Sequence, residues 1–190
     1  MSKSHAAGGP SNQPTAAQFK ELFAQIEAGR ITRGRFQEFL RGQTPPFPSY
    51  AVDVDYNLTV EQLVQAGKYD RANDDISDPH FPMNKKGVEP AEIFIISVVR
   101  RMSTEAISNM IGNLAIPLRH ANVKEELALG AQHPDLQREG PIVALGSTWR
   151  GPSGDVGVPC LVTHGSHRFL NLTWFGGAWA PIWRFAAVRK

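Results

Sequence analysis

The stretch Phe169-Leu170-Asn171-Leu172-Thr173-Trp174-Phe175 alternates strictly between two kinds of side chain. Successive side chains of a β-strand point to opposite faces of a sheet, so Leu170, Leu172 and Trp174 share one face. That face carries what a core needs, and we predict that it is buried. The opposite face mixes aromatic, amide and hydroxyl side chains, which favours a surface that serves recognition. An ordinary half-exposed strand is the alternative interpretation.

The composition around this stretch favours the recognition hypothesis. Glu, Lys, Gln and Met do not occur between Gly140 and Arg189, although they are common earlier in the chain. Strands and tight loops disfavour Glu, Lys and Gln, which accounts for part of the gap. Codons of the form NNY also cannot encode these four residues or Trp. A segment randomised at the adenines of AAY codons would therefore show this gap between fixed tryptophans.

The C-terminal tail resembles the variable region of the target proteins of diversity-generating retroelements. Those proteins are similar to C-type lectins, most closely to the branch that includes formylglycine-generating enzymes. The matching landmarks are the turn Gly146-Ser147-Thr148-Trp149 and the closing segment Arg184-Phe185-Ala186-Ala187-Val188-Arg189. Upstream, residues 118–126 are similar to the helix start of that branch, with His120 and Asn122 as departures. The resemblance is best over about residues 115–190 and weaker back to Tyr50.

This resemblance implies an α+β, C-type-lectin-like domain over residues 50–190, with a variable region at about 150–183 that binds varied partners without catalysis. The implied framework is Trp149, Pro159, Leu161, Gly165, Arg168, Leu170, Leu172, Trp174, Trp179, Arg184 and Phe185. The implied ligand-binding positions, each of a type that an NNY codon encodes, are Val156, Gly157, Cys160, Val162, Thr163, His164, His167, Phe169, Asn171, Thr173, Gly176, Gly177, Ala178, Ala180, Pro181 and Ile182. Trp183 is not reachable from such a codon. The expected partner is a protein or a cell-surface ligand.

The N-terminal third is predicted to be separate from this domain. Residues 1–14 hold small and polar residues, which indicates a disordered tail. Residues 15–43 predict a helical hairpin, because Phe19, Leu22, Phe23 and Ile26 recur at helical spacing. Such a stripe must dock on the main domain or on another chain, so self-association through the hairpin is one expectation. A DNA- or scaffold-binding role is the alternative, since Arg30, Arg33, Arg35 and Arg41 cluster there.

Local signals place the elements between the hairpin and the tail. Residues 50–56 alternate as a strand does, and residues 91–99 form a β-branched apolar run typical of a buried strand. Three helix starts are predicted, at Thr59 with Gln62, at Ser103 or Thr104, and at Asn122 with Glu125. Residues 68–90 are expected to be an irregular connection. The strand at 50–56 should lie near the last strand, since the implied fold brings its ends together.

Charge and cysteine content exclude several classes of protein. The 190 residues carry a net charge of +2, too small to predict nucleic-acid binding, and a single cysteine excludes internal disulfides. No apolar stretch has the length of a membrane span, and the N-terminus has no secretory signal, so a soluble cytoplasmic protein is expected, with export or virion association open.

No catalytic residue, cofactor or metal site is predicted, but two alternatives are kept. Cys160, His164 and His167 have spacings that could serve an enzyme or a metal site. The carboxylates Asp74, Asp75 and Asp78 lie in the 70–90 connection, where a calcium ion could bind.

Overall fold

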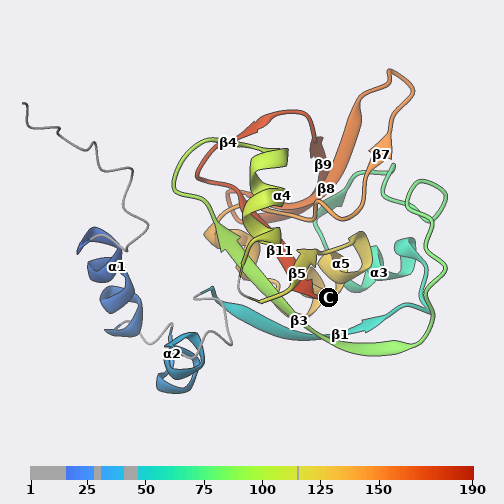
Figure 1. The fold of residues 1–190 in the computed structure, drawn as a ribbon. Helices are drawn as coiled ribbons and strands as arrows, with labels where there is room; N and C mark the ends of the chain where they lie inside the picture. The colour runs from blue at the N-terminus through green and yellow to red at the C-terminus, as the bar shows by residue number, and fades with distance from the viewer. Residues whose placement is uncertain (1–15, 28–30, 41–46, 115) are drawn as a thin grey trace, which may run out of the picture.

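A mixed β-sheet forms the centre of the molecule, with helices on both of its faces (Figure 1). The computed structural model describes residues 16–27, 31–40, 47–114 and 116–190. The helices are α1 (Ala16–Glu27), α2 (Arg33–Leu40), α3 (Val60–Ala66), α4 (Thr104–Gly112), α5 (Val123–Gln132) and the 3-10 helix η1 (Leu136–Glu139). The strands are β1 (Ser49–Asp55), β2 (Arg71–Ala72), β3 (Val88–Ser97), β4 (Met102–Ser103), β5 (Leu118–His120), β6 (Ile142–Val143), β7 (Trp149–Arg150), β8 (Val156–His164), β9 (His167–Trp174), β10 (Ala178–Trp179) and β11 (Arg184–Arg189). The predicted α+β class is confirmed.

The strands pair mainly in antiparallel fashion. In the part of the chain that the structure describes, the order is β1-β3-β11-β6-β8-β9-β2, with β5 also beside β11 and β7 also beside β8. The pairs β11–β6 and β2–β9 are parallel, while β10 and β4 form a separate two-stranded sheet. The first strand, β1, is separated from the last, β11, by β3 alone, so the expected closeness of the two chain segments is confirmed.

Both faces of the central strands are buried. Along β3, Ile93 and Ile95 belong to one hydrophobic cluster, whereas Phe94 and Ile96 belong to a second one on the other face. The first cluster includes side chains of α3 and α5, and the second includes side chains of α4. A strand covered on both faces needs apolar residues at successive positions, which is why residues 93–96 do not alternate. The predicted run at 91–99 extends too far, because β3 ends at Ser97 and Val99 is 95% exposed.

The predicted helix starts are present. The Thr59 hydroxyl accepts from the backbone N–H of Gln62 at 3.2 Å, and the Gln62 side chain accepts from the Thr59 N–H at 2.8 Å. Asn122 and Glu125 form the same reciprocal pair at the start of α5. Ser103 caps α4 by accepting from Ala106. These caps satisfy backbone donors that a helix leaves unpaired at its start.

The connection between α3 and β3 is irregular apart from β2, as expected. Its acidic residues have structural contacts: the Asp78 carboxylate accepts from the backbone N–H of Val60 at 2.8 Å, and the Asp75 carboxylate lies 3.7 Å from Nδ1 of His80. Within the described residues, no three side chains of His, Cys, Asp or Glu gather as a metal site would require.

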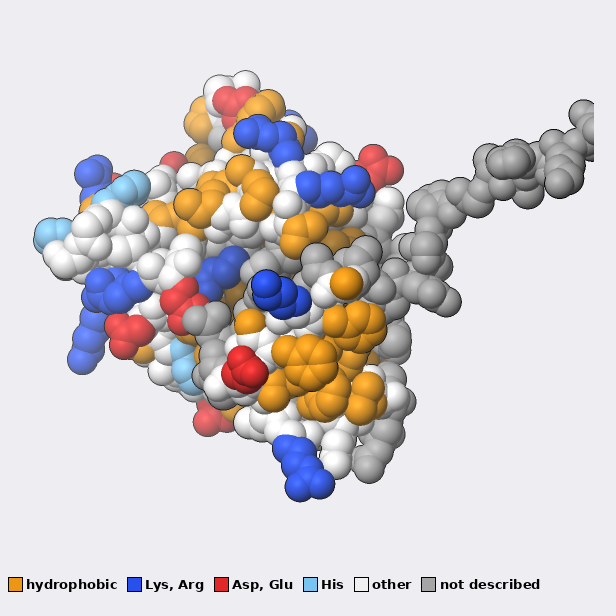
Figure 2. Space-filling model, turned by 90° about the vertical axis from the view of Figure 1, so that its left-hand side faces the viewer, with side chains coloured by type: hydrophobic (Ala, Val, Ile, Leu, Met, Phe, Trp, Pro, Cys, Tyr) orange, Lys and Arg blue, Asp and Glu red, His pale blue; other side chains and the backbone are white. Residues whose placement is uncertain are grey.

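The helices α1 and α2 lie to one side of the sheet (Figure 1). Phe19 and Phe23 are 48% and 59% exposed, so this part of the predicted stripe does not dock on the sheet domain, and Leu40 of α2 is 66% exposed. Hydrophobic side chains gather on the face of the molecule that carries these helices (Figure 2). The predicted tail at 1–14 lies outside the described residues. Among those residues no helix is long and apolar enough to cross a membrane.

Candidate functional site

The strands β8 and β9 form the hairpin that carries most of the predicted contact positions. Residues paired across an antiparallel ladder share a face, so Cys160 and its partner Asn171 point the same way, as do Val162 and Phe169. Their face belongs to the side of the sheet that α4 covers. The opposite face of the hairpin, which includes the pair Leu161 and Leu170, joins the first hydrophobic cluster.

Every predicted contact position except Cys160 reaches the surface. The exposed ones are His164, His167, Asn171, Gly176, Ala178, Pro181 and Ile182. The half-buried ones are Val156, Gly157, Val162, Thr163, Phe169, Thr173, Gly177 and Ala180. They lie near the two ends of the hairpin, at Asn171 in the middle of β9, and on the segment between β9 and β11. The structure therefore brings them onto the same part of the domain without making them one continuous strand face.

The prediction that Cys160 is a contact position at the surface is wrong. The Cys160 side chain is 1% exposed and packs in the second hydrophobic cluster with Val158. The pattern of alternation predicts which side chains share a face, but α4 and its neighbours cover the middle of this one. Cys160 therefore belongs to the core, and we withdraw it from the contact positions.

The prediction of an inward Trp174 is also wrong. Leu170 is buried and Leu172 is half-buried against the first cluster, but Trp174 is 61% exposed. Its indole lies over the following turn, where a Cβ on Gly176 would be 3.0 Å from the ring. The absence of a side chain at Gly176 allows this close approach. Trp174 is thus a large aromatic surface at the end of the hairpin.

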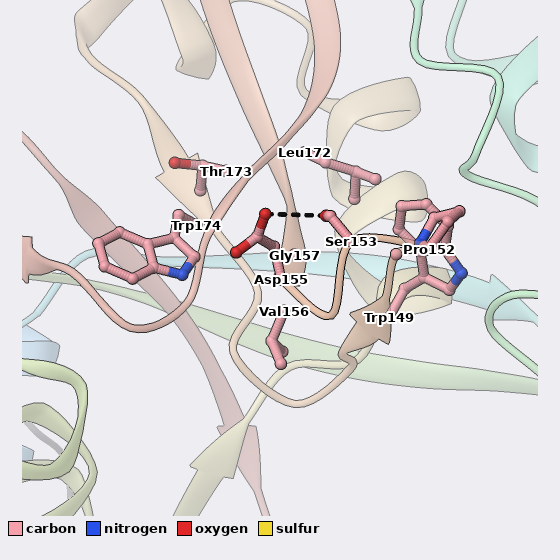
Figure 3. Close-up of a pocket in the computed structure, with 10 residues that line it drawn as sticks. Trp149, Pro152, Ser153, Asp155, Val156, Gly157, Leu172, Thr173 and Trp174 are labelled. Atoms are coloured by element: carbon pink, nitrogen blue, oxygen red, sulfur yellow. Dashed lines mark hydrogen bonds between the residues drawn. The ribbon is translucent and has the colours of Figure 1, made fainter.

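A pocket of about 540 Å³ opens beside Trp174 (Figure 3). Gly157 pairs with Trp149 on one side and with Trp174 on the other, so the two tryptophans flank a residue without a side chain. Leu172 contributes an apolar wall, and Asp155 and Ser153 line the pocket from the turn between β7 and β8. The Trp149 ring stacks on His80 at 4.7 Å between ring centroids, which holds this indole in place.

The pocket carries one formal negative charge. The Asp155 carboxylate accepts from the Ser153 hydroxyl at 2.9 Å. It forms no ion pair with any residue that the structure describes, and it is the single acidic residue between Gly140 and Lys190. Arg150, at the base of the same turn, donates to the Gly154 carbonyl at 2.6 Å instead. The sequence interpretation did not select Asp155, although its isolation among basic residues was a usable signal.

Arg168 fixes the hairpin to the rest of the domain. It is 8% exposed, and its guanidinium donates to the carbonyls of Gly67 at 2.8 Å and Gly130 at 2.6 Å. Its Nε donates to the Gln137 side chain at 3.1 Å, and Gln137 in turn donates to the Val162 carbonyl. These contacts join β9 to α3, α5 and η1. The resemblance implies that Arg168 is a framework residue. Its hydrogen bonds give a physical reason for that role, because one side chain of β9 holds three other elements.

The segment between β9 and β11 is tied down at its middle. The Trp179 indole donates to the Thr104 hydroxyl at 2.8 Å, and this hydroxyl donates to the Phe175 carbonyl at 2.5 Å. Trp179 is 3% exposed and its ring packs edge-on against Phe185 at 5.6 Å. Ala178 and Ile182 on either side remain exposed. The loop therefore has a buried anchor and a free outer surface.

The enzyme and metal alternatives find little support in the geometry. Cys160 and His164 are four residues apart on an extended strand, which separates their backbones by about 13 Å. His164 pairs with His167 at the exposed tip of the hairpin, away from the buried thiol. Burial raises the pKa of the Cys160 thiol above its usual range, which opposes formation of the reactive thiolate.

A buried acid lies behind the hairpin, and sequence interpretation missed it. Glu126 of α5 is 0% exposed, and burial raises the pKa of its carboxyl well above the usual range, while the backbone at Ala144 offsets only part of this. Its charge would also disfavour ionisation of Tyr69 and Cys160. The group is enclosed by the core, so we assign it to the domain's interior and not to the contact surface.

No family model, curated protein or solved structure matches the chain.

Proposed function

We propose that this chain is a ligand-binding protein whose contact surface is diversified by a retroelement. On this proposal residues 50–190 have a C-type-lectin-like fold of the formylglycine-generating-enzyme branch, and the surface consists of the β8–β9 hairpin ends and the 175–183 segment. One observation carries the proposal: the predicted contact positions reach the surface, with Cys160 as the exception, while their neighbours Leu161 and Leu170 lie in the core. Such a division lets the surface change without loss of the fold.

The anchoring of the hairpin supports a binding role. Arg168 and Gln137 hold the strands from behind, and Trp179 holds the following segment. A surface that is ordered before it meets its partner loses little conformational entropy on association. Aromatic and small polar side chains on such a frame are the usual means of recognition in diversified binding proteins. The proposal includes no catalytic step, in keeping with the burial of Cys160.

The proposal predicts that substitutions at the contact positions leave stability unchanged, whereas substitutions in the core reduce it. We expect His164→Tyr, Asn171→Tyr and Ala178→Tyr each to change the free energy of unfolding by about 0.5 kcal/mol or less, because these side chains are exposed. Leu161→Ala and Leu170→Ala, the matched core controls, should each cost about 2 to 5 kcal/mol. Urea denaturation measures all five. If the tyrosine variants lose as much stability as the core variants, the division between frame and contact surface is wrong.

The DNA beside the gene tests the diversification itself. We expect a near-identical repeat that differs from the codons for residues 156–182 only at adenines, next to a reverse transcriptase gene. Differences spread over all four bases would refute diversification by this mechanism, whatever the stability measurements show.

A further inference from the structure

The pocket between Trp149 and Trp174 has a floor without a side chain. Trp149, Gly157 and Trp174 pair in one row across β7, β8 and β9, so they lie on the same face of the sheet. Neighbouring strands are about 4.8 Å apart, which puts the two tryptophan backbones about 10 Å from each other. A Cβ at Gly157 would meet only the Leu172 side chain, at an ordinary 3.6 Å. A side chain is therefore sterically allowed at position 157, and glycine leaves the space open.

The free groups around this space are an aromatic surface and a carboxylate. Trp174 exposes most of its indole, and Leu172 adds an apolar wall. Asp155 extends into the same pocket from the turn before β8, where Figure 3 shows its carboxylate between Trp174 and Ser153. The Ser153 hydroxyl holds one carboxylate oxygen and leaves the other one free of any bond that the described residues provide.

We propose that this pocket binds the guanidinium group of an arginine side chain on a protein partner. A guanidinium is planar and weakly hydrated, so it stacks on an indole face and donates to a carboxylate at the same time. Its three-carbon stem would lie along Leu172. The negative charge of Asp155 has no counter-ion among the described residues, and an incoming cation would supply one.

Other ligand chemistries match the pocket less well. An anion would face Asp155 with like charge. A sugar ring could stack on Trp174, but its hydroxyl groups need several directional partners, and beside the two indole N–H groups the polar side chains that line the pocket are Asp155, Ser153 and Thr173. An ammonium group would satisfy Asp155, yet it lacks the flat surface that an exposed indole face complements.

This inference rests on the proposed function, because that function supplies the expectation that the partner is a protein. Under that function Trp149 and Trp174 are constant, because NNY codons cannot encode them, whereas Val156, Gly157 and Thr173 between them vary. Each variant of the protein would then keep two aromatic walls and change the floor. In this chain, glycine at the floor leaves room for an arginine side chain.

A titration with two isosteric probes tests the inference on the full chain. N-acetyl-arginine methylamide should shift the indole N–H signals of Trp149 and Trp174 saturably, with the signals of Trp179 and Trp183 as internal controls. The neutral N-acetyl-citrulline methylamide should bind about tenfold more weakly, because it loses both the ion pair and the cation–π contact. Asp155→Asn should weaken binding of the arginine probe about threefold. Gly157→Val, which fills the floor, should abolish binding.

Several results would overturn the inference. Equal binding of the two probes, equal shifts at the control tryptophans, or unchanged affinity in Asp155→Asn would each exclude a guanidinium site here. A methyl glycoside that shifts Trp174 when the arginine probe does not would assign the pocket to carbohydrate instead. Asp155 is exposed and Gly157 is half-buried, and comparison of each variant's thermal midpoint with that of the natural chain tests whether the variant is folded. None of these results affects the substitution and DNA tests of the proposed function, so the two can fail separately.

Discussion

Replacement of Arg168 by methionine tests whether one buried side chain holds the binding hairpin in place. Methionine keeps an unbranched apolar stem of similar path but removes every donor. Two backbone carbonyls, those of Gly67 and Gly130, and the side-chain oxygen of Gln137 then lose their partner. The loss at Gly130 is not recoverable within α5, because the residue four positions later is Pro134, which has no N–H.

The magnitude follows from these three contacts. Each buried acceptor left without a donor costs about 1 to 3 kcal/mol. Removal of a buried charge that has no carboxylate partner at its guanidinium offsets part of the sum. We therefore expect Arg168→Met to lower the free energy of unfolding by about 3 kcal/mol. Arg168→Lys should lose nearly as much, because a single ammonium cannot reach three acceptors that lie on three different elements.

Urea denaturation followed by far-UV circular dichroism measures both variants, with Arg150→Met as the matched control. Arg150 is exposed and donates to one carbonyl of its own turn, so its replacement should change stability by about 0.5 kcal/mol or less. A loss below about 1 kcal/mol in Arg168→Met, with an unchanged denaturant slope, would refute the role of Arg168 as the anchor of β9. So would equal losses in the Arg168 and Arg150 variants.

Two further predictions concern buried groups. Folding keeps the Glu126 carboxyl protonated at pH values where the unfolded chain ionises it, so the stability of the natural chain should fall as pH rises above about 4.5, by up to about 1.4 kcal/mol per pH unit. Glu126→Gln lacks this loss; its stability relative to the natural chain should therefore increase from pH 4 to pH 7 in urea titrations, and a constant difference would contradict a neutral Glu126. Because burial shields Cys160 and raises the pKa of its thiol, a chromogenic disulfide reagent should label it only after unfolding, and rapid labelling of the native chain would contradict that burial.

The elements that the sequence predicts correctly are those set by contacts within a few residues. The capping pairs at Thr59 and Asn122 depend on a three-residue spacing, and both appear in the structure. Within the run at 91–99, residues 93–96 are uninterrupted apolar side chains and indicate a strand buried on both faces, as β3 is there. In the helix caps and in the buried strand, the residues that form the sequence pattern are the same residues that are capped or buried in the structure.

The predictions fail where a part of the chain that is distant in sequence decides whether a side chain is buried. The resemblance makes both Cys160 and Asn171 contact positions, and the two residues do share a face of the hairpin. The sequence does not reveal that α4 and its neighbours cover that face at Cys160 and leave it open at Asn171. The alternation gives Trp174 the same face as Leu170. Trp174 is the last residue of β9, however, and its ring lies over Gly176. The pocket requires the pairing of β7, β8 and β9, which joins residues 25 positions apart and has no local signature.

The covering of β8 on both faces limits where the surface of this domain can vary. At the centre of the strand, from Val158 to Leu161, successive side chains enter opposite cores, so a change on either face disturbs packing. The positions of the hairpin that stay exposed are Asn171 in β9 and those at the two ends. One end is the turn at His164 and His167, and the other is the pocket with the segment that follows β9. A diversified form of this fold would therefore have separate contact regions instead of one continuous sheet face.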